Sequence, residues 1–181
     1  GMAELVFVAL TERTTAGAAV EAMIKPRLAG RSAGVISEAG VPAVADPGQL
    51  VVEACHRAGI KVVPLVGPSS IIMAVMASGL SGQSFAFNGY LPVKPPERAK
   101  AIKALERRAH QERQSQIFIE APYRNVKLME QMLHVCATET RLTVACDITS
   151  PEELIVTRSV GQWRQVGVPE IAKRPTIFII G

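Results

Sequence analysis

The chain has 181 residues, of which 48% are hydrophobic and 20% are charged, and this composition excludes a disordered protein. Aromatic residues make up only 4%, which argues against an aromatic surface for stacking single-stranded nucleic acid. No apolar run approaches the roughly 18 residues that a membrane span needs. The net charge is +4, and all of this excess lies between residues 94 and 113.

The first half of the chain alternates predicted helices and strands. Asp46-Pro47 is a helix-start signal, with aspartate as the N-cap and proline in the first turn. Alternating elements of this kind predict an α/β fold with parallel strands and right-handed crossovers. In chain order, we expect a helix over residues 14–29, a strand over 34–37, a helix that ends at Gly59, a strand over 60–66 and a helix that ends at Gly79.

After residue 84 the pattern changes to that of an α+β segment, so we predict two domains, residues 1–82 and 83–181. The expected strands of the second domain are 85–90, 116–120, 142–146, 154–160 and 176–180, and its helices are a basic one after Pro96, one that begins at Pro122 and a short one around Trp163.

The segment of residues 94–113, which contains the basic helix, carries the whole excess of charge. Its apolar side chains recur at helical spacing and are expected to face the core: Ile102, Leu105 and Ala109. On another face, Lys100, Lys103 and Arg107 form what we call the basic stripe. The stripe is either a contact for an anionic partner such as an RNA backbone or an ordinary solvated helix face, and its sequence fits both.

The three cysteines (Cys55, Cys136 and Cys146) have no C-x-x-C spacing, which is typical of reduced thiols in a cytoplasmic protein. The histidines have no ligand spacing with them, so we expect no metal site.

Two loops rich in small residues are the candidates for a ligand-binding site. The chain has no G-x-G-x-x-G motif, no P-loop and no G-x-S-x-G motif. The loops cover residues 37–48 and 66–70, and both follow predicted parallel strands, whose carboxyl ends bind ligands in open α/β sheets. Their small side chains let a ligand approach the backbone closely. Each loop alone also fits a simple turn into a helix.

Together the loops carry a resemblance to a known family. The stretches SEAGVPAVADPG, VVPLVGPSS, FNGYLPVKPPER and IFIEAPYRN, in this order, resemble the tetrapyrrole methylase superfamily over about residues 30–181. The nearest branch is similar to the methyltransferases that modify a ribose 2′-hydroxyl of small-subunit ribosomal RNA. The resemblance implies a homodimer of two-domain α/β subunits, with a mostly parallel sheet in the first domain and a mixed sheet in the second.

The resemblance also implies S-adenosylmethionine as cofactor, folded in the cleft between the domains. Carried over to this sequence, the family's cofactor contacts fall on Ala39, Gly40, Val41, Val44, Ser69, Ser70, Glu120, Ala121, Pro175 and Thr176. Nothing before Arg31 matches the strand and Gly/Pro-rich loop with which the family opens, so we expect an N-terminally truncated chain.

Methyl transfer to a hydroxyl needs alignment and a group that removes the proton. The candidates for that base are Glu38 and Glu120, and Glu120 is equally suited to an ion pair with Arg124 four residues later. Arg124 has two possible roles. It either clamps Glu120, or it binds a substrate phosphate through its planar guanidinium, in which case it and the basic stripe both contact the substrate. Three functions remain open: an RNA ribose methyltransferase, a methyltransferase for a tetrapyrrole or other small molecule, and an inactive fragment.

Overall fold

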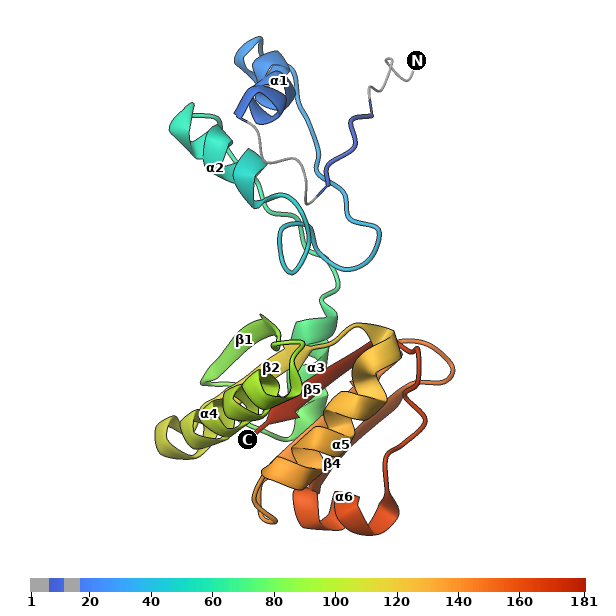
Figure 1. The fold of residues 1–181 in the computed structure, drawn as a ribbon. Coiled ribbons are helices and arrows are strands. Elements are labelled where there is room, and N and C mark those ends of the chain that lie inside the picture. The colour runs from blue at the N-terminus through green and yellow to red at the C-terminus, as the bar shows by residue number, and fades with distance from the viewer. Residues whose placement is uncertain (1–6, 12–16) are drawn as a thin grey trace. The chain divides into compact units, whose positions relative to one another are not determined.

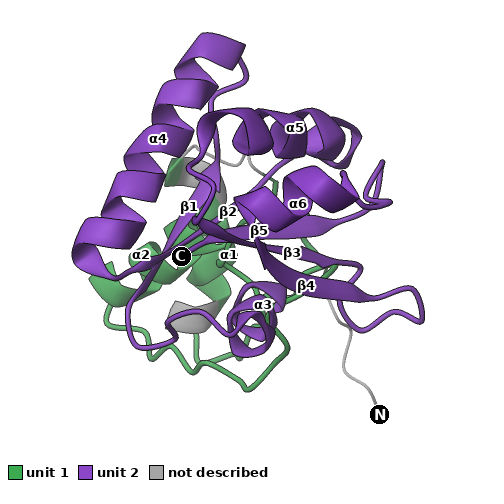
Figure 2. Cartoon of the chain, turned by 90° about the horizontal axis from the view of Figure 1, so that it is seen from below, with its two compact units in different colours: residues 1–69 green, residues 70–181 purple. Residues whose placement is uncertain are grey.

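The computed structural model describes residues 7–11 and 17–181, without the side chains of residues 18, 19, 27 and 28. The chain divides into two compact units, residues 1–69 (unit 1) and 70–181 (unit 2), which Figure 2 shows in different colours. The proposed domains, 1–82 and 83–181, remain a prediction.

Unit 2 is built on a mixed five-stranded sheet with the strand order β1-β2-β5-β3-β4. Strand β1 pairs with β2 in parallel, and the other pairs are antiparallel. The mixed sheet predicted for the second domain is confirmed. The strands are β1 (Phe85–Tyr90), β2 (Ser115–Ile119), β3 (Arg141–Cys146), β4 (Leu154–Ser159) and β5 (Thr176–Ile180).

Helices cover both faces of this sheet (Figure 1). Successive side chains of a strand point to opposite faces, so each buried strand contributes to two cores. Phe118 and Phe178 stack with ring centroids 6.0 Å apart in the core beneath α4, α5 and α6, whereas Ile117 and Ile179 pack with α3 in the other. The helices are α3 (Ser70–Ser78), α4 (Pro95–Glu112), α5 (Asn125–Val135) and α6 (Val160–Val166).

Helix α4 is the predicted basic helix. Ile102, Leu105 and Ala109 are all buried, as their spacing predicts. The helix has a proline in its first turn and ends where Arg113 adopts a left-handed conformation, at φ 51°. The tertiary structure changes one member of the charged set, because Arg98 is buried and donates from Nε to Oε1 of Gln131 on α5.

Unit 1 contains α1 (Gly17–Leu28) and α2 (Gln49–Arg57), packed around Val20, Ile24 and Ala54. Helix α1 confirms the described part of the predicted helix 14–29, and residues 14–16 lie outside the described residues. The N-cap of α2 is Gly48 rather than the predicted Asp46.

The strands predicted over residues 34–37 and 60–66 are absent from the described part of unit 1, so the prediction of a parallel sheet there is wrong for these segments. A strand exists only through ladder hydrogen bonds to a neighbour, and no described segment of unit 1 supplies one. Apolar side chains on both segments remain exposed, with Ile36 79% and Leu65 84% accessible.

None of the helices in the described residues has the length and apolar content to cross a membrane.

Candidate functional site

The loop between residues 38 and 48 has an unusual backbone. Gly40 and Gly48 have positive φ values of 77° and 147°, and two alanines, Ala43 and Ala45, share this left-handed region at 64° and 54°. A non-glycine residue in this region costs of order 1–3 kcal/mol, and such residues cluster at ligand-binding sites. The loop therefore holds its two alanines in a backbone conformation that alanine does not favour.

The two loops predicted to bind the cofactor lie side by side within unit 1. A Cβ atom placed on Gly67 would lie 3.2 Å from Cγ1 of Val41, and one placed on Gly40 would lie 4.0 Å from the carbonyl oxygen of Pro68. The second loop then leads to Ser69 and to Ser70, the first residue of α3. Glycine at position 67 leaves room for Val41, so the packing of the loops depends on the small residues that first marked them.

The first of these loops exposes polar backbone. Ala39 and Gly40 are exposed, and Val44 is 49% exposed. In the described part of the chain, the backbone N–H groups of Gly40 and Val41 have no hydrogen-bond partner. The carboxyl side chain of Glu38 at the start of the loop is exposed as well. This arrangement suits a zwitterionic ligand, which needs donors for its carboxylate and acceptors for its ammonium group.

A second group of predicted residues lies at one end of the sheet in unit 2. Ile119 pairs with Ile177, so Glu120 and Ala121, which follow β2, lie beside Pro175 and Thr176 at the start of β5. Glu120 and Thr176 are buried, and Pro175 is exposed. The antiparallel register thus brings together two predicted segments that are more than 50 residues apart in the sequence.

Glu120 forms an ion pair with Arg124. Oε1 of Glu120 accepts hydrogen bonds from Nη2 of Arg124 and from the backbone N–H of Ala121, both at 2.7 Å. The side-chain hydrogen bond to Glu120 raises the pKa of Arg124 above its ordinary value. The guanidinium also stacks over the ring of Tyr123, 5.0 Å from its centroid. The clamp on Glu120 that the sequence allowed is therefore formed.

Two residues that the sequence analysis did not single out connect the loops at this end of the sheet. Nδ2 of the fully buried Asn125 donates to the carbonyl oxygens of Ile171 and Arg174, at 3.3 and 2.7 Å. Nε of Arg174 donates to Oδ2 of Asp147 at 2.6 Å, and its Nη2 donates to the carbonyl of Glu152. An asparagine at the start of a helix usually indicates a cap, so its inward role had no signal in the sequence.

Three buried polar atoms in this cluster have no partner among the described residues: Oε2 of Glu120, Nε of Arg124 and Oδ1 of Asn125. Buried polar groups are normally hydrogen-bonded, so an unsatisfied set of both donors and acceptors marks a place for water or a ligand. These atoms fit a polar ligand such as S-adenosylmethionine, and so, taken separately, do the free backbone groups beside Gly40 in unit 1.

The basic stripe is fully on the surface, since Lys100, Lys103 and Arg107 are all exposed. Two other cations are neutralised: Lys94, which precedes α4, pairs with Glu97 at 3.6 Å, and Arg108 on α4 pairs with Glu112 at 3.5 Å. Among the described residues, the three stripe residues take part in no ion pair. Their charge is thus available to an anionic partner.

No cluster of three His, Cys, Asp or Glu side chains that would suit a metal ion occurs in the residues that the structure describes.

The mixed α/β sheet of unit 2 and both groups of predicted site residues agree with an α/β methyltransferase. The family model of the Tetrapyrrole (Corrin/Porphyrin) Methylases matches residues 7–163. The chain belongs to this family. The match begins before Arg31, upstream of the stretch from which we inferred the resemblance.

Among curated proteins, the chain is 38% identical over 135 residues to "Ribosomal RNA small subunit methyltransferase I" of Vibrio cholerae, covering 75% of this chain and 46% of that protein. The corresponding protein of Escherichia coli O157:H7 is 35% identical over 133 residues, which is 74% of this chain and 45% of that protein. The chain spans about half the length of the curated relatives it matches.

Among solved structures, the methyltransferase CobJ superposes with a TM-score of 0.60 and 21% identity, covering 90% of this chain and 70% of that one. At this level of identity the similarity concerns the fold alone, and it confirms the α/β fold class.

Proposed function

We propose that this chain carries the S-adenosylmethionine site of a methyltransferase that acts on a ribose 2′-hydroxyl of small-subunit ribosomal RNA. The observation that carries the proposal is the contact between the two small-residue loops, where Gly67 makes room for Val41. The names of the curated relatives, at 38% and 35% identity, support the RNA substrate.

The proposed cofactor contacts are those of the sequence analysis. S-adenosylmethionine, when bound, supplies an already activated methyl group. In our proposal, the free N–H groups of Gly40 and Val41 bind its methionine part, together with Ala39 and Val44, and Ser69 and Ser70 extend this contact. A uroporphyrin-III C-methyltransferase from Thermus thermophilus, solved in complex with S-adenosylhomocysteine, shares the fold at a TM-score of 0.51 and 17% identity.

At the sheet end of unit 2, Glu120, Ala121, Pro175 and Thr176 are proposed to contact the cofactor as well. Asn125 and Arg174 hold these segments in place through the hydrogen bonds described above. When the methyl donor is already activated, the main contribution of a protein is to align the donor with the hydroxyl group. Alignment of this kind lowers a barrier by up to about 7–11 kcal/mol.

We propose Glu38 as the base that removes the hydroxyl proton. Its carboxylate is exposed beside the cofactor loop. The second candidate, Glu120, has one carboxylate oxygen committed to Arg124 and Ala121, which favours an orienting role. Arg124 is correspondingly proposed to act as a clamp, with the basic stripe contacting the RNA.

For the assembly, we propose a homodimer in the cytoplasm. The exposed apolar side chains of Ile36 and Leu65 support the dimer, because apolar surface of this kind is commonly covered by a partner. The cytoplasmic location follows from the proposed ribosomal substrate.

The test measures transfer of radiolabelled methyl from S-adenosylmethionine to small ribosomal subunits, in parallel with a panel of porphyrinoids. Isothermal titration with S-adenosylhomocysteine measures cofactor binding independently. We expect binding and label in the RNA, located at a ribose by nuclease digestion. Label in a porphyrinoid instead would favour the small-molecule alternative, and the absence of any cofactor binding would identify an inactive fragment.

A further inference from the structure

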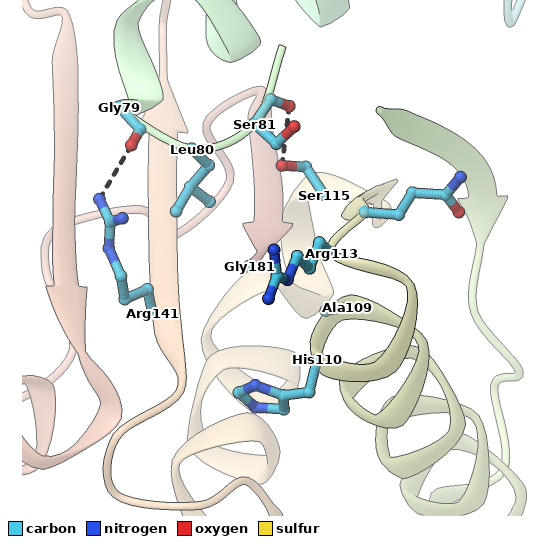
Figure 3. Close-up of a pocket in the computed structure, with 10 residues that line it drawn as sticks. Gly79, Leu80, Ser81, Ala109, His110, Arg113, Ser115, Arg141 and Gly181 are labelled. Carbon is cyan, nitrogen blue, oxygen red and sulfur yellow. Dashed lines mark hydrogen bonds between the residues drawn. The ribbon is translucent and has the colours of Figure 1, made fainter. Parts of the chain in front are cut away.

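A pocket of about 300 Å³ opens at one end of unit 2 (Figure 3). It lies where β2 begins and β5 ends, beside the start of β3 and the end of α4. Ser115, the first residue of β2, donates from Oγ to the carbonyl oxygen of Ser81 at 2.9 Å and closes one side. Among the described residues that line it, none is acidic.

Three basic side chains from separate elements line this pocket. His110 lies in the last turn of α4, Arg113 is the residue with left-handed backbone that ends this helix, and Arg141 is the first residue of β3. Three side chains that carry nitrogen donors, with no acidic side chain among the described lining residues, indicate a site for an anion.

None of the three basic side chains at the pocket forms an ion pair among the described residues, and hydrogen bonds hold two of them. Nη2 of Arg141 donates to the carbonyl oxygen of Gly79 at 3.0 Å, which fixes the guanidinium and leaves its charge unpaired. Nε2 of His110 lies 3.2 Å from Oγ1 of Thr140. In the described part of the chain, the side chain of Arg113 has no hydrogen-bond or ion-pair partner, and its backbone N–H donates to the carbonyl oxygen of Ala109.

The pocket continues the basic stripe. Lys100, Lys103, Arg107 and His110 are separated by three, four and three residues, so they share one face of α4. With a rise of 1.5 Å per residue, the path from Lys100 to Arg113 is about 20 Å long. A row of basic side chains of this length, ending in a pocket, matches the repeated charges of a nucleic-acid backbone.

The pocket lies away from the proposed cofactor contacts of unit 2. Those residues follow the end of β2 and precede β5, whereas the pocket lies at the beginning of β2 and the end of β5. A five-residue strand spans roughly 17 Å at 3.3–3.4 Å per residue. A ligand in the pocket therefore contacts neither Glu120 nor Thr176.

We infer that this pocket binds a phosphate group of the RNA backbone and anchors the strand that runs along α4. The guanidinium groups of Arg113 and Arg141 supply planar donor pairs that suit phosphate oxygens. Contacts of this kind position a nucleic acid without reading its sequence. The inference rests on the proposed function for its RNA, whereas the affinity of the pocket for phosphate follows from its side chains alone.

The test uses the full chain with two probes, inorganic phosphate and a 20-nucleotide oligouridylate. The variants are Arg113→Gln and the double variant Arg113→Gln/Arg141→Gln. The side chain of Arg113 has no described partner, so the single variant should leave the fold intact. Lys127→Gln is the matched control, because Lys127 is an exposed cation on the neighbouring helix α5.

With inorganic phosphate, we expect the imidazole resonances of His110 to shift in the parent chain and in Lys127→Gln, but not in the double variant. With oligouridylate, the double variant should lose one phosphate contact. This loss should lower the slope of log affinity against log salt by roughly 0.7. The control should keep the slope of the parent.

The outcomes separate the inference from the proposed function. If the parent chain binds oligouridylate and the double variant keeps its salt slope, the phosphate anchor is wrong while the proposed function stands. A phosphate-dependent shift with an unchanged salt slope would mean that the pocket takes free phosphate only, and would also overturn the anchor. A parent chain that neither binds oligouridylate nor methylates ribosomal subunits overturns both.

Discussion

The guanidinium of Arg124 lies 2.7 Å from Oε1 of Glu120, whose side chain is completely buried. Glu120 is a carboxylate that the sequence offers as a catalytic base. In the structure its Oε1 is occupied, which favours a role in fixing the segment that follows β2. A clamp and a catalytic base predict different effects of Glu120→Gln on stability and on methyl transfer.

If Glu120 is held as a clamp, Glu120→Gln should lower the free energy of unfolding by about 1–3 kcal/mol, because the hydrogen-bonded ion pair with Arg124 is lost. Methyl transfer should fall together with stability and should recover partly in Glu120→Gln/Arg124→Gln. Chemical denaturation and single-turnover transfer measure the two effects. A variant that folds with parental stability but loses transfer would assign the base to Glu120.

Gly40→Val should abolish binding of S-adenosylhomocysteine. The positive φ of 77° makes the substitution cost about 1–2 kcal/mol of stability in any case. Gly30→Val is the matched control, because Gly30 has a φ of 81° in the same unit and lies outside both loops. Calorimetry should show lost affinity for the Gly40 variant alone. Equal affinities in the two variants would refute the assignment of this loop.

The triple change of Lys100, Lys103 and Arg107 to glutamine should lower the salt slope of RNA binding by roughly 2, at about 0.7 per phosphate contact. Glutamine has a helix propensity close to that of lysine and arginine, so α4 should persist. Cofactor affinity should not change. Arg108→Gln is the control, because Arg108 is already paired with Glu112. An unchanged slope would mean that the stripe is an ordinary solvated helix face.

The chain should form a dimer with twice its mass of 19.4 kDa. Light scattering coupled to gel filtration measures this directly. Ile36→Ser and Leu65→Ser remove exposed apolar groups and should weaken the dimer if that surface is covered. A single monomeric species at high concentration would contradict the proposal.

Burial raises the pKa of Cys136 to about 12 from 9.0, and burial also raises the pKa of Cys146. The unfolded chain therefore loses these protons at a lower pH than the folded chain. Their contribution to stability is complete below about pH 9 and declines as the pH rises toward 12. Unfolding titrations between these values should show the decline, and Cys136→Ala should reduce it.

The same burial predicts the order of alkylation. Cys55 is only partly buried, and it should react with iodoacetamide before Cys136 and Cys146 in the folded chain. Mass spectrometry of the labelled peptides gives the order. Equal labelling of all three would show that the core around Cys136 opens readily.

Local patterns were sufficient to predict the elements of unit 2. The strands 85–90 and 176–180 have the predicted bounds, and Ile102, Leu105 and Ala109 are buried as their spacing indicates. Helical and strand periodicities are properties of consecutive residues, and a core that buries one face reinforces them. The two small-residue loops were recognised for the same reason, since their glycines, alanines and prolines are contiguous.

Relationships between distant residues were decided only by the tertiary structure. Arg98 belongs to the same charged run as the basic stripe, yet packing against α5 buries it on Gln131. The segments 34–37 and 60–66 have strand composition, but a strand also needs a neighbour, which the described residues of unit 1 do not provide.

The ends of the sheet illustrate the same limit. The antiparallel pairing of β2 with β5 brings Glu120 beside Thr176 at one end, and it brings Ser115 and Gly181 to the pocket at the other. The sequence supplied the side chains of both places. Strand register, which depends on burial of whole faces rather than on any local motif, determined which of them meet.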